Sequence, residues 1–207
     1  VIVPAASWIS TSEAVSARGA TPVFVDVEED YFNINPALIE AAITANTKAI
    51  IPVHLYGHPA DMPAIMAIAK KYNLIVIEDC AQSHASAIHE KLAGTFGHAA
   101  SFSFYPGKNL GAYGDAGCMA TSDDAIAEKV RMIANHGQKG KHNHIMEGRN
   151  SRLDGLQAAI LSAKLPYLHQ WTNARIALAA QYNTSITNAG LGLPKTKQKY
   201  KHVFHLY

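Results

Sequence analysis

The residue best suited to covalent chemistry is Lys108, which lies in a turn with Pro106, Gly107, Asn109 and Gly111. The turn follows an apolar run, and its glycines let a ligand approach the backbone closely. A desolvated lysine has a lowered pKa, so that its neutral amine becomes a usable nucleophile. A lone lysine in a turn is more often a solvated surface residue, and this feature alone leaves both interpretations open.

Other groups have the types needed to hold a flat, phosphorylated ligand beside that amine. Asp79 ends an apolar run, where its charge is costly unless a cation meets it, although it could simply cap the next turn. Ser101 and Ser103 alternate with aromatic residues and share one face of an expected strand. Trp8 follows a strand end, where it packs in the core or stacks on a planar ligand. Together these groups match the needs of pyridoxal phosphate (PLP) catalysis.

Short apolar runs alternate with helical segments, which predicts an α/β fold with a mostly parallel central sheet flanked by helices. In such sheets ligands bind at the carboxyl ends of the strands. The expected strands are 1–4, 21–26, 48–55, 74–77 (buried on both faces), 100–105, 117–121 and an interrupted strand at 203–207. The expected helices are 10–18, 37–44 with Asn35 as N-cap, 60–72, 123–135 capped by Asp123, and 153–189, which Pro166 kinks or splits.

Composition favours a single large globular domain. The 207 residues are 48% hydrophobic and 16% charged, with a net charge of +2, and no basic stripe indicates nucleic acid. The apolar runs are too short to cross a membrane. Two cysteines, Cys80 and Cys118, form neither a disulfide framework nor a metal quartet, so we expect a reducing cytoplasm. We find no signal peptide. Both ends read as interrupted strands, which indicates a fragment of a longer product.

We expect no metal site. His142-x-His144 lacks a third ligand and more often belongs to a solvated loop. His54 is expected to pack beneath the site, and Cys80 to be a small buried residue. Arg149 and Arg152 are left open between binding anionic groups and forming ion pairs at an interface.

Six blocks, in order along nearly the whole chain, resemble the DegT/DnrJ/EryC1/StrS family of sugar aminotransferases. The block around Lys108 is the most specific of them. The six blocks are Val3-Pro4-x-x-x-Trp8, Gly19–Val27, Pro52–Gly57, Glu78-Asp79-x-Ala81-Gln82, Ser103–Gly111 and Asn150–Ala159. The resemblance implies the PLP-dependent transferase fold of aspartate aminotransferase, fold type I. Residues 1–165 would form the large domain without its N-terminal portion, and 166–207 a long helix and the start of a truncated small domain.

The resemblance also implies roles for particular residues. Lys108 would be the Schiff-base lysine and would then move the proton during transfer. Asp79 would pair with the pyridine nitrogen of PLP, Gln82 with its phenolic oxygen and Ser103 with its phosphate, while Trp8 would stack on the ring. Asn150 would reach the phosphate of the neighbouring subunit's cofactor, because family members are homodimers with shared active sites.

The implied reaction is transamination of a 3-keto or 4-keto nucleotide-linked sugar, with an amino-acid donor, usually glutamate. It would serve surface-polysaccharide or amino-sugar synthesis, and the stretch 150–154 slightly favours 3-keto substrates. One alternative is a PLP-dependent sugar dehydratase, but that branch has histidine where Lys108 stands. The other is a non-catalytic fragment or paralogue. The family's Gly-Thr/Ser phosphate-binding turn precedes Val1, so whether these residues bind PLP unaided stays open.

Overall fold

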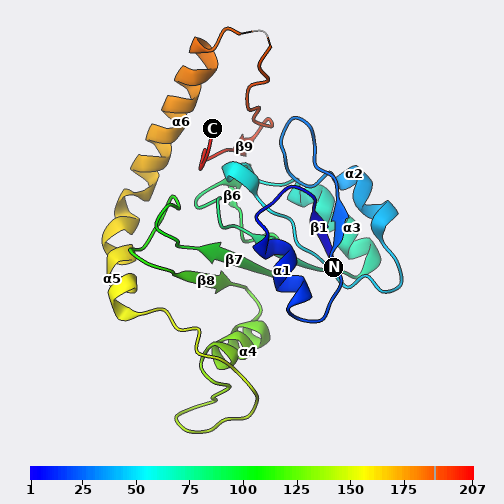
Figure 1. The fold of residues 1–207 in the computed structure, drawn as a ribbon, viewed down its shortest axis with the longest axis vertical. Helices are drawn as coiled ribbons and strands as arrows, with labels where there is room; N and C mark the ends of the chain where they lie inside the picture. The colour runs from blue at the N-terminus through cyan, green and yellow to red at the C-terminus, as the bar shows by residue number, and fades with distance from the viewer. Residues whose placement is uncertain (189) are drawn as a thin grey trace.

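A six-stranded sheet forms the centre of the molecule (Figure 1) in a computed structural model that describes residues 1–188 and 190–207. All neighbouring strands are parallel except the last pair. Their order is β2 (Val23–Val25), β1 (Ile2–Pro4), β3 (Ala49–Ile50), β4 (Ile75–Asp79), β7 (Ala99–Ser103) and β8 (Gly117–Ala120). A smaller antiparallel sheet has the order β6 (Lys91–Leu92), β5 (Ala87–Ile88), β9 (Tyr200–Lys201). The predicted α/β class is therefore confirmed.

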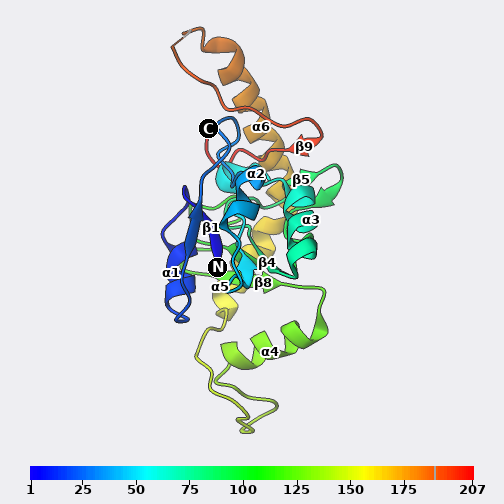
Figure 2. The same ribbon diagram turned by 90° about the vertical axis from the view of Figure 1, so that its right-hand side faces the viewer.

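Helices cover both faces of the central sheet. Figure 2 shows α1 (Ser10–Ser16) on one side and α2 (Pro36–Ile39) and α3 (Met62–Tyr72) on the other. In Figure 1, α4 (Asp124–Ala134) projects below the sheet, and α5 (Gly155–Lys164) and α6 (Leu168–Ser185) run up its left side. Three 3-10 turns are η1 (Glu40–Ala42), η2 (Leu55–Gly57) and η3 (Leu165–Tyr167). Across residues 1–188 and 190–207, every helix is too short or too polar to span a bilayer.

The main core lies between the strands and the α2–α3 layer. Ile2 and Ile50 are fully buried and paired across β1 and β3, and Ile39 and Ile65 pack against them from the helices. Burying one such side chain contributes about 1.5–3 kcal/mol. The branched side chains favour the strand conformation and fill the layer beneath it, so the same residues specify both the sheet and its packing.

The predicted helix caps are confirmed. Asn35 Oδ1 accepts a hydrogen bond from the backbone N–H of Ala37 at 3.0 Å, and Asp123 Oδ1 accepts one from Ala125 at 2.8 Å. Both satisfy N–H groups that the first helical turn leaves without partners. Pro166 lies in η3 and splits the long helical segment into α5 and α6. The division follows because proline lacks the N–H that a continuous helix needs at that position.

Some predicted boundaries were wrong. The strand expected over 48–55 is only β3, because Pro52 cannot donate to the ladder and Leu55 already begins η2. The strand expected at 203–207 is absent from the described chain, since Phe204 turns through φ 44°. Helix 37–44 ends earlier, with α2 passing into η1. Ile75 is 45% exposed at the first position of β4, so this strand is not buried on both faces along its whole length.

The end of β4 is fixed by a buried carboxylate, Glu78, which is 0% exposed. Its Oε1 accepts from the backbone N–H groups of Phe96 and Gly97 at 2.7 and 2.6 Å. Its Oε2 accepts from Gly94 N–H at 2.7 Å and pairs with His54 Nε2 at 3.0 Å. Because Ala60 N–H donates to Nδ1 of the same imidazole, the ring proton lies on Nε2 and is donated to the carboxylate.

These four donors keep the buried carboxylate charged. Burial raises the pKa of Glu78, but the hydrogen bonds from His54, Gly97 and Gly94 outweigh burial and hold the pKa below its usual value. The carboxylate therefore ties three stretches of backbone together at the carboxyl end of β4. They are the His54 turn, β4 itself and the loop at 94–97.

Replacing Glu78 by glutamine is expected to destabilise the fold by about 3 kcal/mol, because either amide orientation points an NH₂ group at two N–H donors. Urea unfolding followed by circular dichroism measures the loss. The control is Glu128→Gln, which removes an exposed ion pair with Lys139 and should change little. Equal stability of Glu78→Gln and the unmodified chain would contradict the assignment of Glu78 as a charged structural anchor.

Candidate active site

Three predicted site residues meet at the carboxyl edge of the parallel strands. Asp79 is the last residue of β4 and is paired in register with Ser101 of β7, so the two lie on the same face. Ser103 ends β7 on that face, two residues further along. The chain leaves β1 to form β2 on one side and returns to form β3 on the other. Such a switch in strand order opens a crevice for ligands.

The carboxylate of Asp79 is half-buried, and α1 helps to orient it. Thr11 Oγ1, on α1, donates to Asp79 Oδ2 at 3.3 Å, and Ser7 Oγ lies 2.8 Å from the same hydroxyl. Asp79 Oδ1 accepts from the backbone N–H of Ala81 at 3.0 Å. The capping role considered from the sequence is therefore real for one oxygen. The other oxygen is held by a hydroxyl, with accepting capacity left for a cationic group.

Lys108 is half-buried, and its environment tunes its amine. Burial lowers the pKa of Lys108, and the negative charge of Asp79 raises it by less, so the net shift is downward. The turn that carries the lysine is closed by a hydrogen bond from Lys108 N–H to the Tyr105 carbonyl at 2.8 Å. A β-carbon at Gly111 would lie 2.4 Å from the Pro106 carbonyl oxygen, so the turn requires glycine there. This lysine is thus not a freely solvated surface residue.

Gln82 has a fixed orientation. Its Oε1 accepts from the backbone N–H of Tyr56 at 2.6 Å, which turns the amide so that its NH₂ group is the end available to a ligand. An amide NH₂ donates and cannot accept, so this end suits an anionic oxygen. Tyr56 holds the strained conformation needed for this contact, with φ 58°.

Trp8 is 74% exposed, which rules out the core-packing interpretation and leaves its ring face open. Ser103 is half-buried, and its Oγ accepts from Tyr105 N–H at 3.3 Å. The hydroxyl proton remains available for an acceptor. Asn150 is exposed, with Arg152 Nε donating to its Oδ1 at 3.0 Å, and it pairs with Asn135 beyond the end of α4. No hydrogen bond among the described residues joins Asn150 to the Lys108 turn.

Three polar residues near Lys108, namely His84, Asn109 and His205, were not among the predicted site residues, although Asn109 belongs to the Lys108 turn. His84 and Asn109 are buried, and both ring nitrogens of His84 have no hydrogen-bond partner among residues 1–188 and 190–207. Burial and the Lys108 charge lower the pKa of His84 to about 4. His205 is nearly a hundred residues away in sequence but bonds Asn109 at 3.0 Å. Only the tertiary fold brings these side chains together.

A second grouping, His54, Glu78 and Cys80, has metal-ligand chemistry, with ligand atoms within 4.8 Å of one another. The carboxylate already accepts four hydrogen bonds, and both nitrogens of the imidazole are engaged. Burial raises the pKa of the Cys80 thiol well above its usual value, which disfavours the thiolate that metals bind. The grouping is therefore a structural cluster. His54 and Cys80 occupy the buried positions predicted for them.

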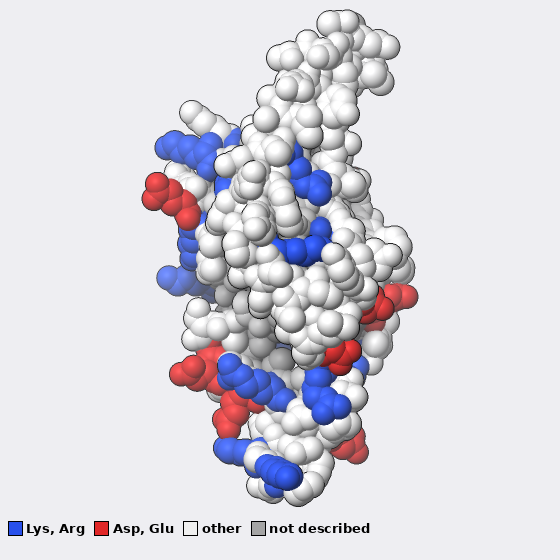
Figure 3. Space-filling model, turned by 90° about the vertical axis from the view of Figure 1, so that its left-hand side faces the viewer, with Lys and Arg blue, Asp and Glu red and all other residues white. Residues whose placement is uncertain are grey.

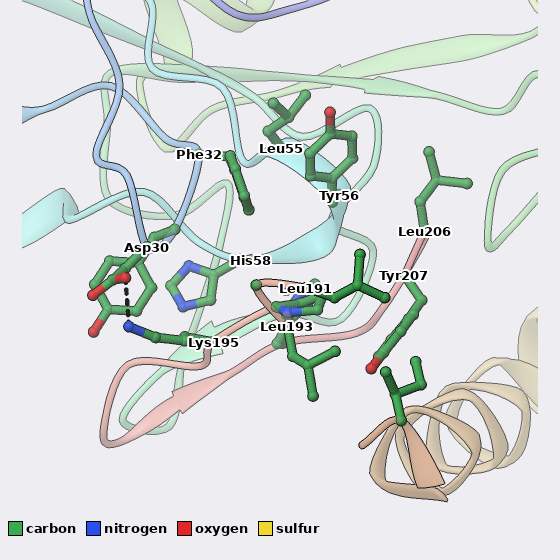
Figure 4. Close-up of a pocket in the computed structure, with 15 residues that line it drawn as sticks. Asp30, Phe32, Leu55, Tyr56, His58, Leu191, Leu193, Lys195, Leu206 and Tyr207 are labelled. Carbon is green, nitrogen blue, oxygen red and sulfur yellow. Dashed lines mark hydrogen bonds and ion pairs between the residues drawn. The ribbon is translucent and has the colours of Figure 1, made fainter. Parts of the chain in front are cut away.

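A cavity of about 490 Å³ lies next to the candidate site but holds none of the predicted residues. Figure 4 shows Phe32, Tyr56 and His58 on one side of it and Leu191, Leu193 and Tyr207 on the other. Its lining is mostly apolar, with a Lys195–Asp30 ion pair at 2.6 Å. We place the chemistry at Lys108 and Asp79 instead, because the pKa of the Lys108 amine is lowered by burial and the charge of the Asp79 carboxylate acts on that amine.

Replacing Asp79 by asparagine is expected to lower the Lys108 pKa further, because the amide removes the one nearby charge that raises it. The pKa can be followed by ¹³C NMR of reductively methylated lysines, with the Lys108 signal assigned from Lys108→Arg. Asp124→Asn, on the exposed start of α4, is the control and should leave that signal unchanged. A rise of the Lys108 pKa in Asp79→Asn would refute the proposed pairing.

The chain is similar to known proteins over its whole length. The model of the DegT/DnrJ/EryC1/StrS aminotransferase family matches residues 1–207. A pleiotropic regulatory protein of Geobacillus stearothermophilus is 51% identical, covering 100% of this chain and 56% of the relative. UDP-N-acetyl-3-dehydro-alpha-D-glucosamine 3-aminotransferase of Acidithiobacillus ferrooxidans is 49% identical, with coverage of 100% and 56%. The X-ray structure of S. venezuelae DesV with a ketimine intermediate has a TM-score of 0.96 at 45% identity, with coverage of 100% and 56%.

The chain thus spans about half the length of the relatives it matches. The family match covers every residue, and the fold agrees with that of solved sugar aminotransferases. The aminotransferases of this family depend on PLP. On this evidence the chain belongs to the DegT/DnrJ/EryC1/StrS aminotransferase family.

Proposed function

We propose that this chain is the catalytic part of a PLP-dependent aminotransferase that acts on nucleotide-linked keto-sugars. The observation that carries the proposal is the position of Asp79 at the carboxyl edge of the sheet, in register with Ser101 of β7, where its charge acts on the half-buried Lys108 amine. Residues 1–165 are its large domain and 166–207 lead into its small domain. The free cysteines fit the reducing cytoplasm in which we place the enzyme.

The residues present fit PLP. Its aldehyde needs an amine, its ring nitrogen a carboxylate, its phenolic oxygen a donor and its planar ring a flat surface. Lys108, Asp79, the NH₂ end of Gln82 and the exposed ring of Trp8 supply these in turn. When bound, PLP supplies an electrophilic carbon for amines and a protonated ring that accepts electrons from the substrate carbon. Ser103 has a hydroxyl proton for the phosphate.

The chain's own contribution is proton control and orientation. Because the pKa of Lys108 is lowered, more of its amine is neutral near pH 7 and able to attack or accept a proton. Asp79, oriented by the Thr11 hydroxyl, would pair with the ring nitrogen of bound PLP and favour the protonated form of that nitrogen. Lys108 Nζ would hold PLP and would also be the group that accepts and returns the proton that transfer of the amino group requires.

We favour a 3-keto sugar as acceptor and glutamate as donor, in the synthesis of a polysaccharide or an amino sugar. The name of the Acidithiobacillus relative supports amination at carbon 3, as does the stretch at 150–154. The regulatory name of the Geobacillus relative keeps a non-catalytic role as the second candidate. Lys108 argues against the dehydratase branch, which has histidine at that position.

We propose a homodimer with shared sites. Figure 3 shows the α5–α6 side, where charged side chains lie at the lower end, along one margin and near the middle, and the uppermost part is free of them. Helix α6 contains one charged residue, Arg175, while exposed apolar side chains run over this side of the chain. Contiguous exposed apolar surface usually marks an interface. The exposed apolar side chains on this side include Tyr113, Leu156, Leu165, Tyr167 and Leu178. Asn150 would then reach the neighbouring subunit's cofactor phosphate.

Adding PLP is expected to give a visible absorbance band, which borohydride fixes as a reduced pyridoxyl group on the peptide that contains Lys108. Lys108→Ala should abolish both band and label, whereas Lys129→Ala, on exposed α4, should keep them. The two candidate functions then separate. Labelling only when the remaining half of the protein is present would assign the activity to the whole protein. Absence of labelling in both forms would favour the non-catalytic role.

A further inference from the structure

The segment 203–207 docks on η2, beside the candidate site. The backbone N–H of Val203 donates to the Gly57 carbonyl at 3.0 Å, and that of His205 donates to the Tyr56 carbonyl at 2.8 Å. A β-carbon at Gly57 would lie 2.8 Å from Val203 Cγ2, so only glycine permits this approach. Phe204 and Tyr56 both have positive φ, 44° and 58°. Two strained residues at one contact indicate a functional constraint.

The side chain of His205 reaches the residue next to Lys108. Its Nδ1 lies 3.0 Å from Asn109 Oδ1, and since that oxygen can only accept, Nδ1 carries the proton and donates. Asn109 is 5% exposed, and its Nδ2 has no partner anywhere in the described chain. Within residues 1–188 and 190–207, His205 therefore provides the only hydrogen bond to this buried amide.

His205 thus connects two turns of the site. On one side its backbone holds Tyr56, whose own N–H fixes Gln82 at 2.6 Å. On the other its imidazole holds Asn109 and, with it, the turn that carries Lys108. We propose that His205 is a positioning residue that fixes the Lys108 amine relative to Gln82. This inference rests on the proposed function for the meaning of the site, but the geometry belongs to the chain alone.

The surroundings of His205 suit a neutral imidazole. Burial lowers its pKa to about 4, and the nearby charges of Lys108 and Arg175, with His84, act in the same direction. At pH 7 the ring therefore donates from Nδ1 without adding a positive charge beside Lys108. Arg175 of α6 also donates to the His205 carbonyl at 3.4 Å.

The neighbours of His205 hold it in place. Leu206 lines the 490 Å³ cavity together with Tyr56, and Figure 4 shows these two side chains on adjacent elements. The Tyr207 hydroxyl donates to Asn183 of α6 at 2.8 Å. His205 is therefore held by contacts of the residues on both sides of it, Val203 before it and Tyr207 after it.

The test uses His205→Leu, which removes the donor but keeps bulk, and His205→Asn, whose Nδ2 can replace the imidazole Nδ1. In the chain without PLP, ¹³C NMR of methylated lysines reports the Lys108 pKa. His205→Leu is expected to raise it toward the ordinary value, because a loosened turn admits water, and to slow PLP capture about tenfold. His205→Asn should restore both. His169→Leu, exposed on α6, is the control.

Asn109→Ala removes the same bond from the other side and serves if His205→Leu fails to fold. Combined with His205→Leu it should add nothing further, because both substitutions break one interaction. An unchanged Lys108 pKa and capture rate in folded His205→Leu or Asn109→Ala would overturn the proposal, as would failure of His205→Asn to restore them. If neither this chain nor the protein with its remaining half captures PLP, the proposed function fails, while the Lys108 pKa still decides the positioning role.

Discussion

The buried carboxylate of Glu78 is the interaction on which the candidate site depends. Adjacent residues of a strand face opposite sides of a sheet, so fixing Glu78 beneath β4 makes Asp79 face the crevice. Four hydrogen bonds hold the buried charge, and they come from the His54 turn and the loop at 94–97. A carboxylate without those donors could not remain charged in the interior. The position of the Asp79 carboxylate therefore follows from the hydrogen bonds that hold Glu78, the residue before it.

The same backbone links extend across the sheet edge. His54 N–H donates to the Asp79 carbonyl at 3.1 Å, and η2 begins directly after His54. Tyr56 in that turn then fixes Gln82 and receives the segment at 203–207. The site is thus built from turns that lie after separate strands and share hydrogen bonds.

Two opposing effects set the pKa of Lys108 at this edge: burial lowers it, and the negative charge of Asp79 raises it by less. Burial alone favours a neutral amine at Lys108, and Asp79 moderates that effect without reversing it. His84 and His205 are neutral at pH 7, so neither adds a competing charge. Helix α6, by contrast, has a single charged residue, Arg175.

The sequence by itself determined the α/β class, the caps at Asn35 and Asp123 and the split at Pro166, because these depend on local periodicity and on backbone hydrogen bonding near each residue. It also indicated Lys108 and Asp79, which follow apolar strands. Tertiary structure alone decided that the segment at 203–207 is not a strand and that His205 meets Asn109. Contacts between residues so far apart depend on how layers pack and which buried polar groups find partners, and no local pattern encodes that.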